Sequence, residues 1–314
     1  MSQTVAVCVT KINQVTPMIR EFTFEAIDQP LKPFSSGSHV VVQLPLHDRV
    51  IRNAYSLLND PYEQHQYQIA VRLQENSRGG SKYLHEHIQV GDTLQISSPL
   101  NLFSLHSQAQ HHVFIAGGIG ITPFLSHMKY LLHKGHSFEL HYACRDGISN
   151  AYENMLQQLF HEHVHIYSEK TQRRLDIQAL LSQQAMSSHV YICGPERLID
   201  AVLYSAEHLG WSQQRVHWEA FSSPATGVAF DAILTKSQRK IHVPSDFSLL
   251  EALEQAGVAV PNLCRGGVCG QCVTAYSQGQ VEHLDHYLTV QEQAFQLMPC
   301  VSRAQQGHCL HLEL

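Results

Sequence analysis

The sequence lacks the features that define several large classes of protein. No hydrophobic run approaches the length of a membrane span, and the N-terminal residues MSQTVAVCVTKI have neither the basic stretch nor the long apolar core of a signal peptide. Basic residues are fewer than acidic ones, 21 against 27, so the chain has no basic excess with which to hold nucleic acid. We therefore expect a globular protein with no membrane span and no nucleic-acid partner.

A disulfide framework, an internal repeat and low-complexity segments are also missing. The eight cysteines have no paired spacing, and 314 residues can build cores without covalent staples, so we expect a reducing, cytoplasmic location. Histidine is abundant, with 23 residues, but the His-rich stretches 161–167 and 283–287 have no companion carboxylate or cysteine at metal-ligand spacing. We interpret these histidines as surface or compositional features.

Strand and helix patterns divide the chain into three parts. Residues 1–106 carry short strand-like runs separated by Gly, Pro and Asn or Asp, which predicts a small antiparallel β-barrel. Residues 107–221 alternate strands with helices, which predicts an α/β domain with a doubly wound parallel sheet. A polar, turn-forming segment, 222–228, is the predicted linker to a small α+β domain, 229–314.

The individual elements follow from the same patterns. The predicted strands are 5–12, 19–26, 39–46, 67–73 and 93–97 in the first part, and 111–118, 138–144, 164–169, 189–195 and 216–221 in the second. The predicted helices of the second part are 122–132, 150–160, 176–184 and 196–209. The third part should contain a hairpin (228–235 and 240–244), a helix at 248–257 capped by Ser248 and ended by Gly257, and a closing strand at 309–314.

The stretch CRGGVCGQC concentrates three thiols near the end of the chain. Four residues separate Cys264 from Cys269, two separate Cys269 from Cys272, and Cys300 follows later in MPCVS. This is the C-x4-C-x2-C…C spacing of plant-type [2Fe–2S] clusters. The four cysteines are therefore the predicted metal ligands.

Glycines are as dense as thiols in this stretch. Cluster sulfurs need backbone N–H donors close by, and glycines at 266, 267 and 270 free the loop to wrap that tightly. Zinc is the main alternative, but zinc sites usually take two short Cys knuckles and this loop has one. The remaining thiols outside a glycine motif lie in or beside apolar strands and are predicted to be buried: Cys8, Cys144 and Cys309.

A glycine turn, AGGIGITPF (116–124), follows one predicted strand and opens a helix. Gly118 and Gly120 would let the backbone approach a ligand, while Thr122 could cap the helix and Pro123 suits its first turn. The helix N-terminus would then face an anion such as a dinucleotide pyrophosphate. Plain strand–helix packing explains a lone glycine turn about as well.

CGPERLIDAV (193–202) repeats this arrangement at the end of another strand. Ligands bind at the carboxyl ends of strands in open parallel sheets. Cys193 alone could be a core thiol, but its place beside Gly194 and Pro195 favours a site position.

Taken in order, the motifs resemble one known family. IRNAYSLLND (51–60), NSRGGSKYL (76–84), AGGIGITPF, YICGPERLID, HWEAF and the ferredoxin cysteines are similar to the phthalate dioxygenase reductase family, across essentially the whole chain. These are one-chain NADH-dependent reductases that use FMN and a [2Fe–2S] cluster to serve Rieske oxygenases. Within the family, the sequence most resembles the reductase subunits of carnitine monooxygenase, and next those of vanillate demethylase.

The resemblance implies roles for particular residues. Tyr55 and Ser56 would lie against the flavin, and the nicotinamide would be flanked by Cys193 and its neighbours. From the residues alone, Tyr55 would be assigned to the core or surface and Glu219 to a solvated charge. The implied catalytic residues are Ser56, Cys193 and Glu219; the implied cofactor-binding residues are Gly79, Gly80 and Ser81 for the flavin phosphate, Gly118, Gly120 and Thr122 for the NADH pyrophosphate, Cys193, Gly194 and Pro195 for the nicotinamide, and Phe221 with Glu219 for the flavin pocket.

One position departs from the family pattern. The family usually has Arg two residues before the Tyr, in contact with the flavin phosphate, whereas this chain has Asn53, with Arg52 one place earlier. Side chains alternate along a strand, so Arg52 is predicted to point the other way. Arg72 and Arg78 are then the candidates to meet the phosphate charge. The arrangement with a C-terminal ferredoxin implies FMN rather than FAD.

The implied reaction order is NADH, FMN, [2Fe–2S] and then an external oxygenase. A flavin can accept a hydride and release single electrons, and plant-type clusters, near about −400 mV, lie below Rieske centres at roughly −150 to +300 mV. The alternatives are a diiron hydroxylase or cytochrome P450 as acceptor, or a redox-sensing interaction protein. Arg145 could meet the 2′-phosphate of NADPH, but Asp146 beside it would repel one, which favours NADH.

Overall fold

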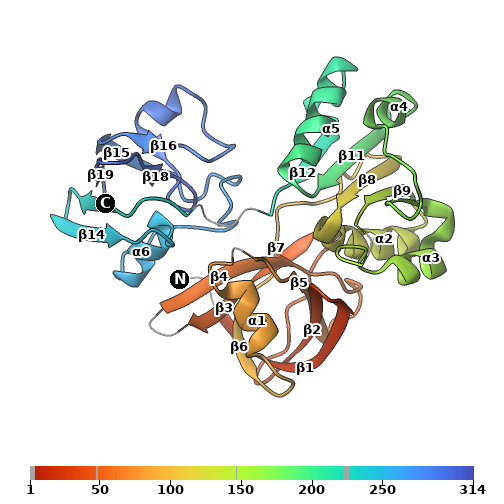
Figure 1. Cartoon of the computed structure of the whole chain (residues 1–314), viewed down its shortest axis with the longest axis horizontal. Coiled ribbons are helices and arrows are strands. Elements are labelled where there is room, and N and C mark those ends of the chain that lie inside the picture. Colours follow the sequence, from red (N-terminus) through yellow and green to blue (C-terminus); the bar gives the residue numbers. More distant parts are fainter. Residues whose placement is uncertain (1–3, 47–48, 76, 146, 222–225) are drawn as a thin grey trace. The chain divides into compact units, whose positions relative to one another are not determined.

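The computed structural model describes residues 4–46, 49–75, 77–145, 147–221 and 226–314 (Figure 1). The chain forms two compact units. The larger unit comprises Ser2–Leu44 and Tyr55–Phe221, and the smaller unit comprises Pro45–Ala54 and Ser222–Leu314. Most of the predicted linker, 222–225, lies outside the described residues. Among the described residues, no helix has the length and apolarity to cross a membrane.

The N-terminal part is an antiparallel sheet, as predicted. Its order is β4-β3-β6-β1-β2-β5, with β7 paired to β3. The strand patterns predicted five of these seven strands and missed the two-residue β7 and β4, whose RVIRNAYS pattern mixes two arginines and an asparagine into the strand and so lowers its β-propensity. The elements are β1 (Thr4–Thr16), β2 (Ile19–Ala26), β3 (Ser38–Leu46), β4 (Arg49–Ser56), β5 (Gln66–Arg72), α1 (Gly80–Glu86), β6 (Thr93–Ser97) and β7 (Leu100–Asn101).

The second part is a parallel sheet of order β10-β9-β8-β11-β12, so the doubly wound prediction is confirmed. Every predicted strand and helix of this part is present within a few residues. The elements are β8 (His111–Gly117), a 3₁₀ turn (Gly118–Ile121), α2 (Thr122–Lys134), β9 (Ser137–Ala143), α3 (Glu153–Phe160), a 3₁₀ turn (His161–His163), β10 (Val164–Tyr167), α4 (Ile177–Ser182), β11 (Ser188–Cys193), α5 (Glu196–His208), a 3₁₀ turn (Gln213–Arg215) and β12 (Val216–Glu219).

Two helical layers cover the two faces of the parallel sheet (Figure 1). Side chains alternate along each strand, so even-numbered residues of β8 pack against α2 and α3, together with buried residues of the N-terminal sheet such as Ile19 on β2 and Ala70 on β5. Odd-numbered residues of the same strand, including Val113 and Ile115, pack against α4 and α5. The carboxyl ends of the strands are thereby left as the edge at which a ligand can bind.

The C-terminal part has a mixed sheet, β14-β13-β19-β15-β17, and a small pair, β16-β18. Ser248 caps its helix in a full capping box with Glu251, and Gly257 follows the helix at φ +75°, both as predicted. The elements are β13 (Phe230–Leu234), β14 (Arg239–Val243), α6 (Leu249–Gln255), β15 (Thr274–Gln278), β16 (Val281–Glu282), a 3₁₀ turn (Glu292–Ala294), β17 (Gln296–Leu297), β18 (Arg303–Ala304) and β19 (Leu310–Leu312).

Candidate functional site

The two glycine motifs of the parallel sheet meet at one point. β8 and β11 are neighbours, and the chain leaves them in opposite directions, toward β9 and toward β12. A Cβ on Gly120 would lie 2.2 Å from the carbonyl oxygen of Cys193, and a Cβ on Gly117 would lie 2.6 Å from Cδ of Pro195. Gly120 is therefore required for backbone packing, and the packed turns form the topological switch point where such sheets bind nucleotides.

Thr122 does not cap the helix, so that prediction is wrong. The N-cap of α2 is Ile121, and no side chain makes a capping hydrogen bond. The reason is the 3₁₀ turn at Gly118–Ile121, which runs directly into the helix, so that the Thr122 hydroxyl donates instead to the carbonyl of Ile119 at 3.0 Å. The first turn of α2 also has no acidic residue, which keeps its positive end available to an anion.

Cys193 and Glu219 lie opposite each other at the ends of β11 and β12. The thiol is fully buried, and this burial, together with the nearby Glu219 carboxylate, raises the pKa of Cys193 well above its usual value. Cys193 is consequently a neutral thiol. Phe221, two residues beyond Glu219, is 43% exposed and presents an aromatic ring at the end of the described part of this segment.

The residues expected to hold the flavin come from two segments of the N-terminal part. Asn53 and Tyr55 are half-buried on β4, Ser56 is buried at its end, and Arg72 is exposed at the end of β5. Across the turn that follows, Gly79 has φ +111° and forms the N-cap of α1 without any side-chain capping hydrogen bond. This uncapped start suits a phosphate, since the first N–H groups of a helix need an acceptor.

Ser81 is less free than its neighbours. Its hydroxyl donates to Oγ of Ser77 at 3.0 Å and accepts from the backbone N–H of Gln74 at 3.3 Å. Ser81 therefore links Ser77, in the turn before α1, to Gln74, just after β5, by hydrogen bonds. It can still accept one further bond, because a hydroxyl offers one donor site, which Ser77 takes, and two acceptor sites.

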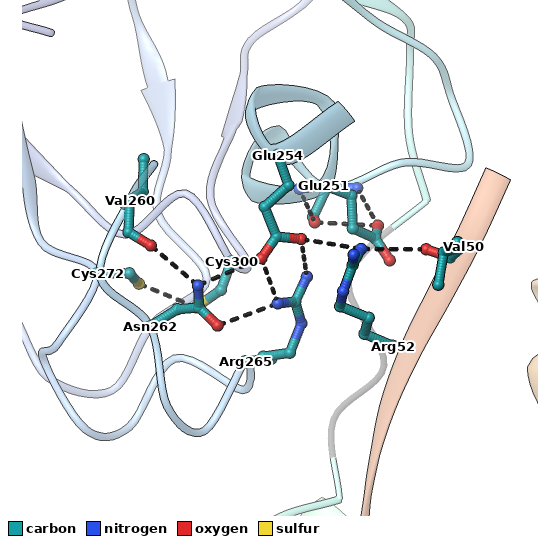
Figure 2. A network of polar contacts seen from close by, with 10 residues as sticks. Val50, Arg52, Glu251, Glu254, Val260, Asn262, Arg265, Cys272 and Cys300 are labelled. Atoms are coloured by element: carbon teal, nitrogen blue, oxygen red, sulfur yellow. Dashed lines mark hydrogen bonds and ion pairs between the residues drawn. The ribbon is translucent and has the colours of Figure 1, made fainter. Parts of the chain in front are cut away.

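The cysteine loop brings its four sulfurs together in the smaller unit. Cys272 and Cys300 are buried, with their sulfurs 3.4 Å apart (Figure 2), while Cys264 and Cys269 are half-buried. The Cys269 thiol and the backbone N–H groups of the loop, including that of Gly266 at 3.4 Å, lower the pKa of Cys264 to about 5. Converging thiols surrounded by N–H donors fit a [2Fe–2S] cluster.

Backbone conformation explains two of the three loop glycines. Gly267 and Gly270 have φ of +77° and +72°, and a Cβ on Gly270 would lie 2.2 Å from the Tyr287 ring. The third left-handed residue of the loop is Arg265, at φ +55°, rather than Gly266. A non-glycine residue in this region is strained, so other contacts must hold Arg265 in place.

Those contacts are shown in Figure 2. The Arg265 guanidinium donates to both carboxylate oxygens of Glu254, at 2.8 Å each, and to Oδ1 of Asn262 at 3.0 Å. Arg52 adds an ion pair to the same carboxylate at 3.4 Å. Arg265 is 7% exposed, so this bidentate pair is largely desolvated and fixes the residue that directly follows the first cluster ligand.

Sequence reasoning missed this network and the packing role of Gly117. The double glycine in AGGIG was a signal for Gly117, because only a residue without a Cβ fits against Pro195. Nothing local pointed to Glu254 as the partner of Arg265, or to Glu254 as the carboxylate that Arg52 reaches. Side-chain partners from different elements are set by the fold.

Comparison with known protein families agrees with this arrangement. Residues 6–104 match the oxidoreductase FAD-binding domain, residues 96–216 match the dimethylamine monooxygenase subunit DmmA-like N-terminal domain, and residues 233–305 match the 2Fe-2S iron-sulfur cluster binding domain. These matches and the site geometry define an electron-transfer oxidoreductase with a flavin-binding domain and a 2Fe–2S domain.

Relatives that align over nearly the whole chain indicate which family of electron-transfer oxidoreductases it belongs to. The chain is 52% identical to the heme-dependent oxidative N-demethylase beta subunit of Ectopseudomonas mendocina, over 96% of this chain and 97% of that one. It is 44% identical to the carnitine monooxygenase reductase subunit of Escherichia coli, over 98% and 97%. The solved structure of phthalate dioxygenase reductase aligns with a TM-score of 0.89 and 33% identity, over 99% and 98%. The chain belongs to the phthalate dioxygenase reductase family, as its motifs predicted.

Proposed function

We propose that this protein takes hydride from NADH and passes the electrons singly, through FMN and a [2Fe–2S] cluster, to an oxygenase component. The observation that carries the proposal is the pairing of two sites in one chain. The larger unit has a nucleotide-type switch point between β8 and β11, and the smaller unit has four converging thiols. A bound flavin supplies the step between them, because it accepts electron pairs and releases single electrons.

The residues of the larger unit orient the reactants. Gly118, Gly120 and Thr122 would receive the NADH pyrophosphate at the start of α2, where no acidic residue opposes it. Cys193 lies at the end of β11 and would contact the nicotinamide as a neutral thiol, so it would exclude water and introduce no charge. Gly194 and Pro195 would complete that wall.

The flavin would be placed by residues at the ends of β4 and β12. We expect the Ser56 hydroxyl to hydrogen-bond the reactive nitrogen, Tyr55 to lie against the ring, and Glu219 and Phe221 to close the pocket. Ser56 is 5% exposed, so a hydrogen bond from it would form away from bulk water.

FMN rather than FAD remains the flavin we propose, because the 2Fe-2S domain follows the flavin-binding domain, an arrangement that goes with FMN in the family that the motifs resemble. Gly79, Gly80 and Ser81 would hold the phosphate at the uncapped start of α1, with charge supplied by Arg72 and Arg78. Asn53 can donate a hydrogen bond there but brings no charge. We therefore expect weaker flavin binding than in relatives with arginine at that position.

The cluster would be held by Cys264, Cys269, Cys272 and Cys300, and the partner would dock near this loop. Residues 229–314 contain eight acidic and five basic side chains, a net charge of −3, so a modestly basic patch on the partner would favour encounter. Coupled turnover should then fall as salt is raised. Salt-independent turnover would remove the electrostatic part of this proposal.

Two classes of partner have specific support. A Rieske oxygenase is the partner that the motif resemblance implies, and the carnitine monooxygenase reductase subunits at 44% and 41% identity support a monooxygenase partner. A haem-containing partner is supported by the relative at 52% identity and by a self-sufficient cytochrome P450 monooxygenase, whose chain contains a segment that aligns with 99% of this chain at 33% identity and a TM-score of 0.73. We also propose that the protein is located in the cytoplasm.

The test is an anaerobic titration of reconstituted protein with NADH, followed by visible absorption. Bleaching of both the flavin and the iron–sulfur bands supports the route. Bleaching of neither, with NADPH no better, would overturn it. The same titration, repeated with NADPH, decides between NADH and NADPH. Arg145, the candidate partner of a 2′-phosphate, is exposed after β9, and Asp146 lies outside the described residues.

A further inference from the structure

Three side chains of the larger unit form a cluster that the proposed electron-transfer route does not use. Glu139 and His141 lie on β9, and His165 lies on β10. Their potential ligand atoms all lie within 4.8 Å of one another. The cluster therefore combines two imidazoles and a carboxylate, which is one of the common donor sets for zinc.

Strand register brings these residues together. His165 is the direct partner of His141 in the parallel pairing of β10 with β9, and Glu139 precedes His141 by two residues. Because side chains alternate, all three point to one face of the sheet, opposite to the face of Leu140 and Tyr142. The two imidazole rings stack at 4.8 Å between centroids.

His141 is held in the orientation that a metal ligand needs. It is 5% exposed, and its Nδ1 is 2.9 Å from the hydroxyl of Tyr167. Its Nε2 is buried, makes no hydrogen bond to any described residue, and lies 3.5 Å from Oε1 of Glu139. Metal-bound histidines typically have one ring nitrogen fixed by an outer partner and the other on the ion.

Glu139 and His165 also have the orientation or the protonation state that a metal ligand needs. Gln184 donates to Oε1 of Glu139 at 2.7 Å and orients the carboxylate. Burial would raise the pKa of Glu139, but His111 and His141 lower it well below its usual range, so the group is ionised. Burial and His141 lower the pKa of His165, which keeps this imidazole neutral, as metal ligation requires.

From this geometry we infer that Glu139, His141 and His165 form a binding site for a divalent transition-metal ion, with Zn²⁺ the ion that the donor set suits best. A tetrahedral zinc with bonds of about 2.1 Å needs its ligands at about 3.4 Å from one another, so the three side chains must draw together by roughly an ångström. The fourth position is left to water. The bound ion would tie the four-residue edge strand β10 to β9.

The experiment uses the holoprotein, with flavin and cluster confirmed by visible absorption. It is dialysed against micromolar buffered Zn²⁺, and zinc and iron per chain are measured by mass spectrometry. The wild type is expected to retain one zinc per chain with unchanged iron. H165Q should bind zinc at least 10-fold more weakly, and Y167F, which removes the outer partner of His141, should weaken it about 10- to 100-fold.

H161Q is the matched control, because it removes a histidine from the same stretch whose side chain is 68% exposed. It should bind zinc like the wild type. X-ray absorption at the zinc edge should show N and O ligands near 2.0–2.1 Å and no sulfur near 2.3 Å. Equal zinc binding by the wild type, H165Q and Y167F, or sulfur ligation from the cysteine loop, would overturn the site and leave the cluster as an ion-pair network. Neither result bears on the NADH titration.

Discussion

The two units of this protein close their cores by different means. The larger unit packs residues of its two sheets and of helices α2 and α3 around aromatic and aliphatic side chains, among them Phe114, Phe124 and Tyr191, all fully buried. In the smaller unit, Cys272 and Cys300, 2% and 1% exposed, are themselves members of the hydrophobic core. The described chain between α6 and β15 has no helix or strand, and this is the segment with three of the predicted ligands.

This difference indicates what each unit depends on. The larger unit depends on side-chain packing, so substitutions at tight backbone contacts should affect it most. We expect the smaller unit to depend on its cluster as well as on its core, because three of the four predicted ligands lie in a segment without helix or strand. Each prediction below perturbs one of the two units and measures the effect that its way of packing implies.

Cys272→Ser should have the largest effect. It removes a buried thiol that we propose as a cluster ligand, so electron transfer to the partner should be abolished and the smaller unit should lose several kcal/mol of unfolding free energy. NADH should still bleach the flavin at the wild-type rate, because the larger unit is unchanged. Anaerobic stopped-flow absorption measures flavin reduction and electron transfer to the partner. Normal coupled turnover in this variant would contradict the proposed route.

Gly120→Ala should have the corresponding effect on the larger unit. Its Cβ would lie 2.2 Å from the Cys193 carbonyl, so the unfolding free energy should fall by about 4 kcal/mol and NADH binding should be lost. Gly210→Ala is the control: Gly210 has φ +73° but a Cβ there would meet nothing within 4 Å, so the substitution should cost only the backbone strain, about 1 kcal/mol. Equal losses in the two variants would show that close packing at the switch point is not the cause.

Glu254→Gln should destabilise the smaller unit by about 3 kcal/mol, because it leaves the buried Arg265 without its charged partner. The cluster should be lost faster, and its electron paramagnetic resonance signal should shift, since Arg265 follows Cys264 directly. Glu282→Gln, on an exposed side chain, is the control. An unaltered signal and an unaltered rate of cluster loss would mean that the ion pair does not position the loop.

Acid should weaken the larger unit progressively, because several of its histidines are buried. Burial lowers the pKa of His39 and His112 to about 4 and that of His127 to about 3. These groups are neutral in the fold but protonate near pH 6.5 in the unfolded chain, so stability is lost as pH falls from about 6.5 toward 4. Each histidine should contribute about 1 kcal/mol per pH unit. Denaturant melts monitored in each unit test this slope, and a flat profile over that range would contradict it.

The fold was largely predictable because its signals are local. Alternating strands and helices, the Ser248 cap and the short barrel strands each depend on residues close in sequence. β4 was missed because its polar residues hide the alternation, and the Thr122 cap was wrong because the preceding glycines formed a 3₁₀ turn. The grouping of Pro45–Ala54 with the C-terminal residues had no local signal at all.

The sequence by itself was enough to predict the cluster ligands and to locate the two glycine turns. The thiols of Cys264, Cys269 and Cys272 fall within nine residues, so their spacing alone defines the chemistry. Only the tertiary structure decided that Gly120 packs on Cys193, that Glu254 holds Arg265, and that His165 lies beside Glu139 and His141. Those pairs depend on strand order and register, which are set by the packing of the whole sheet and not by any short segment.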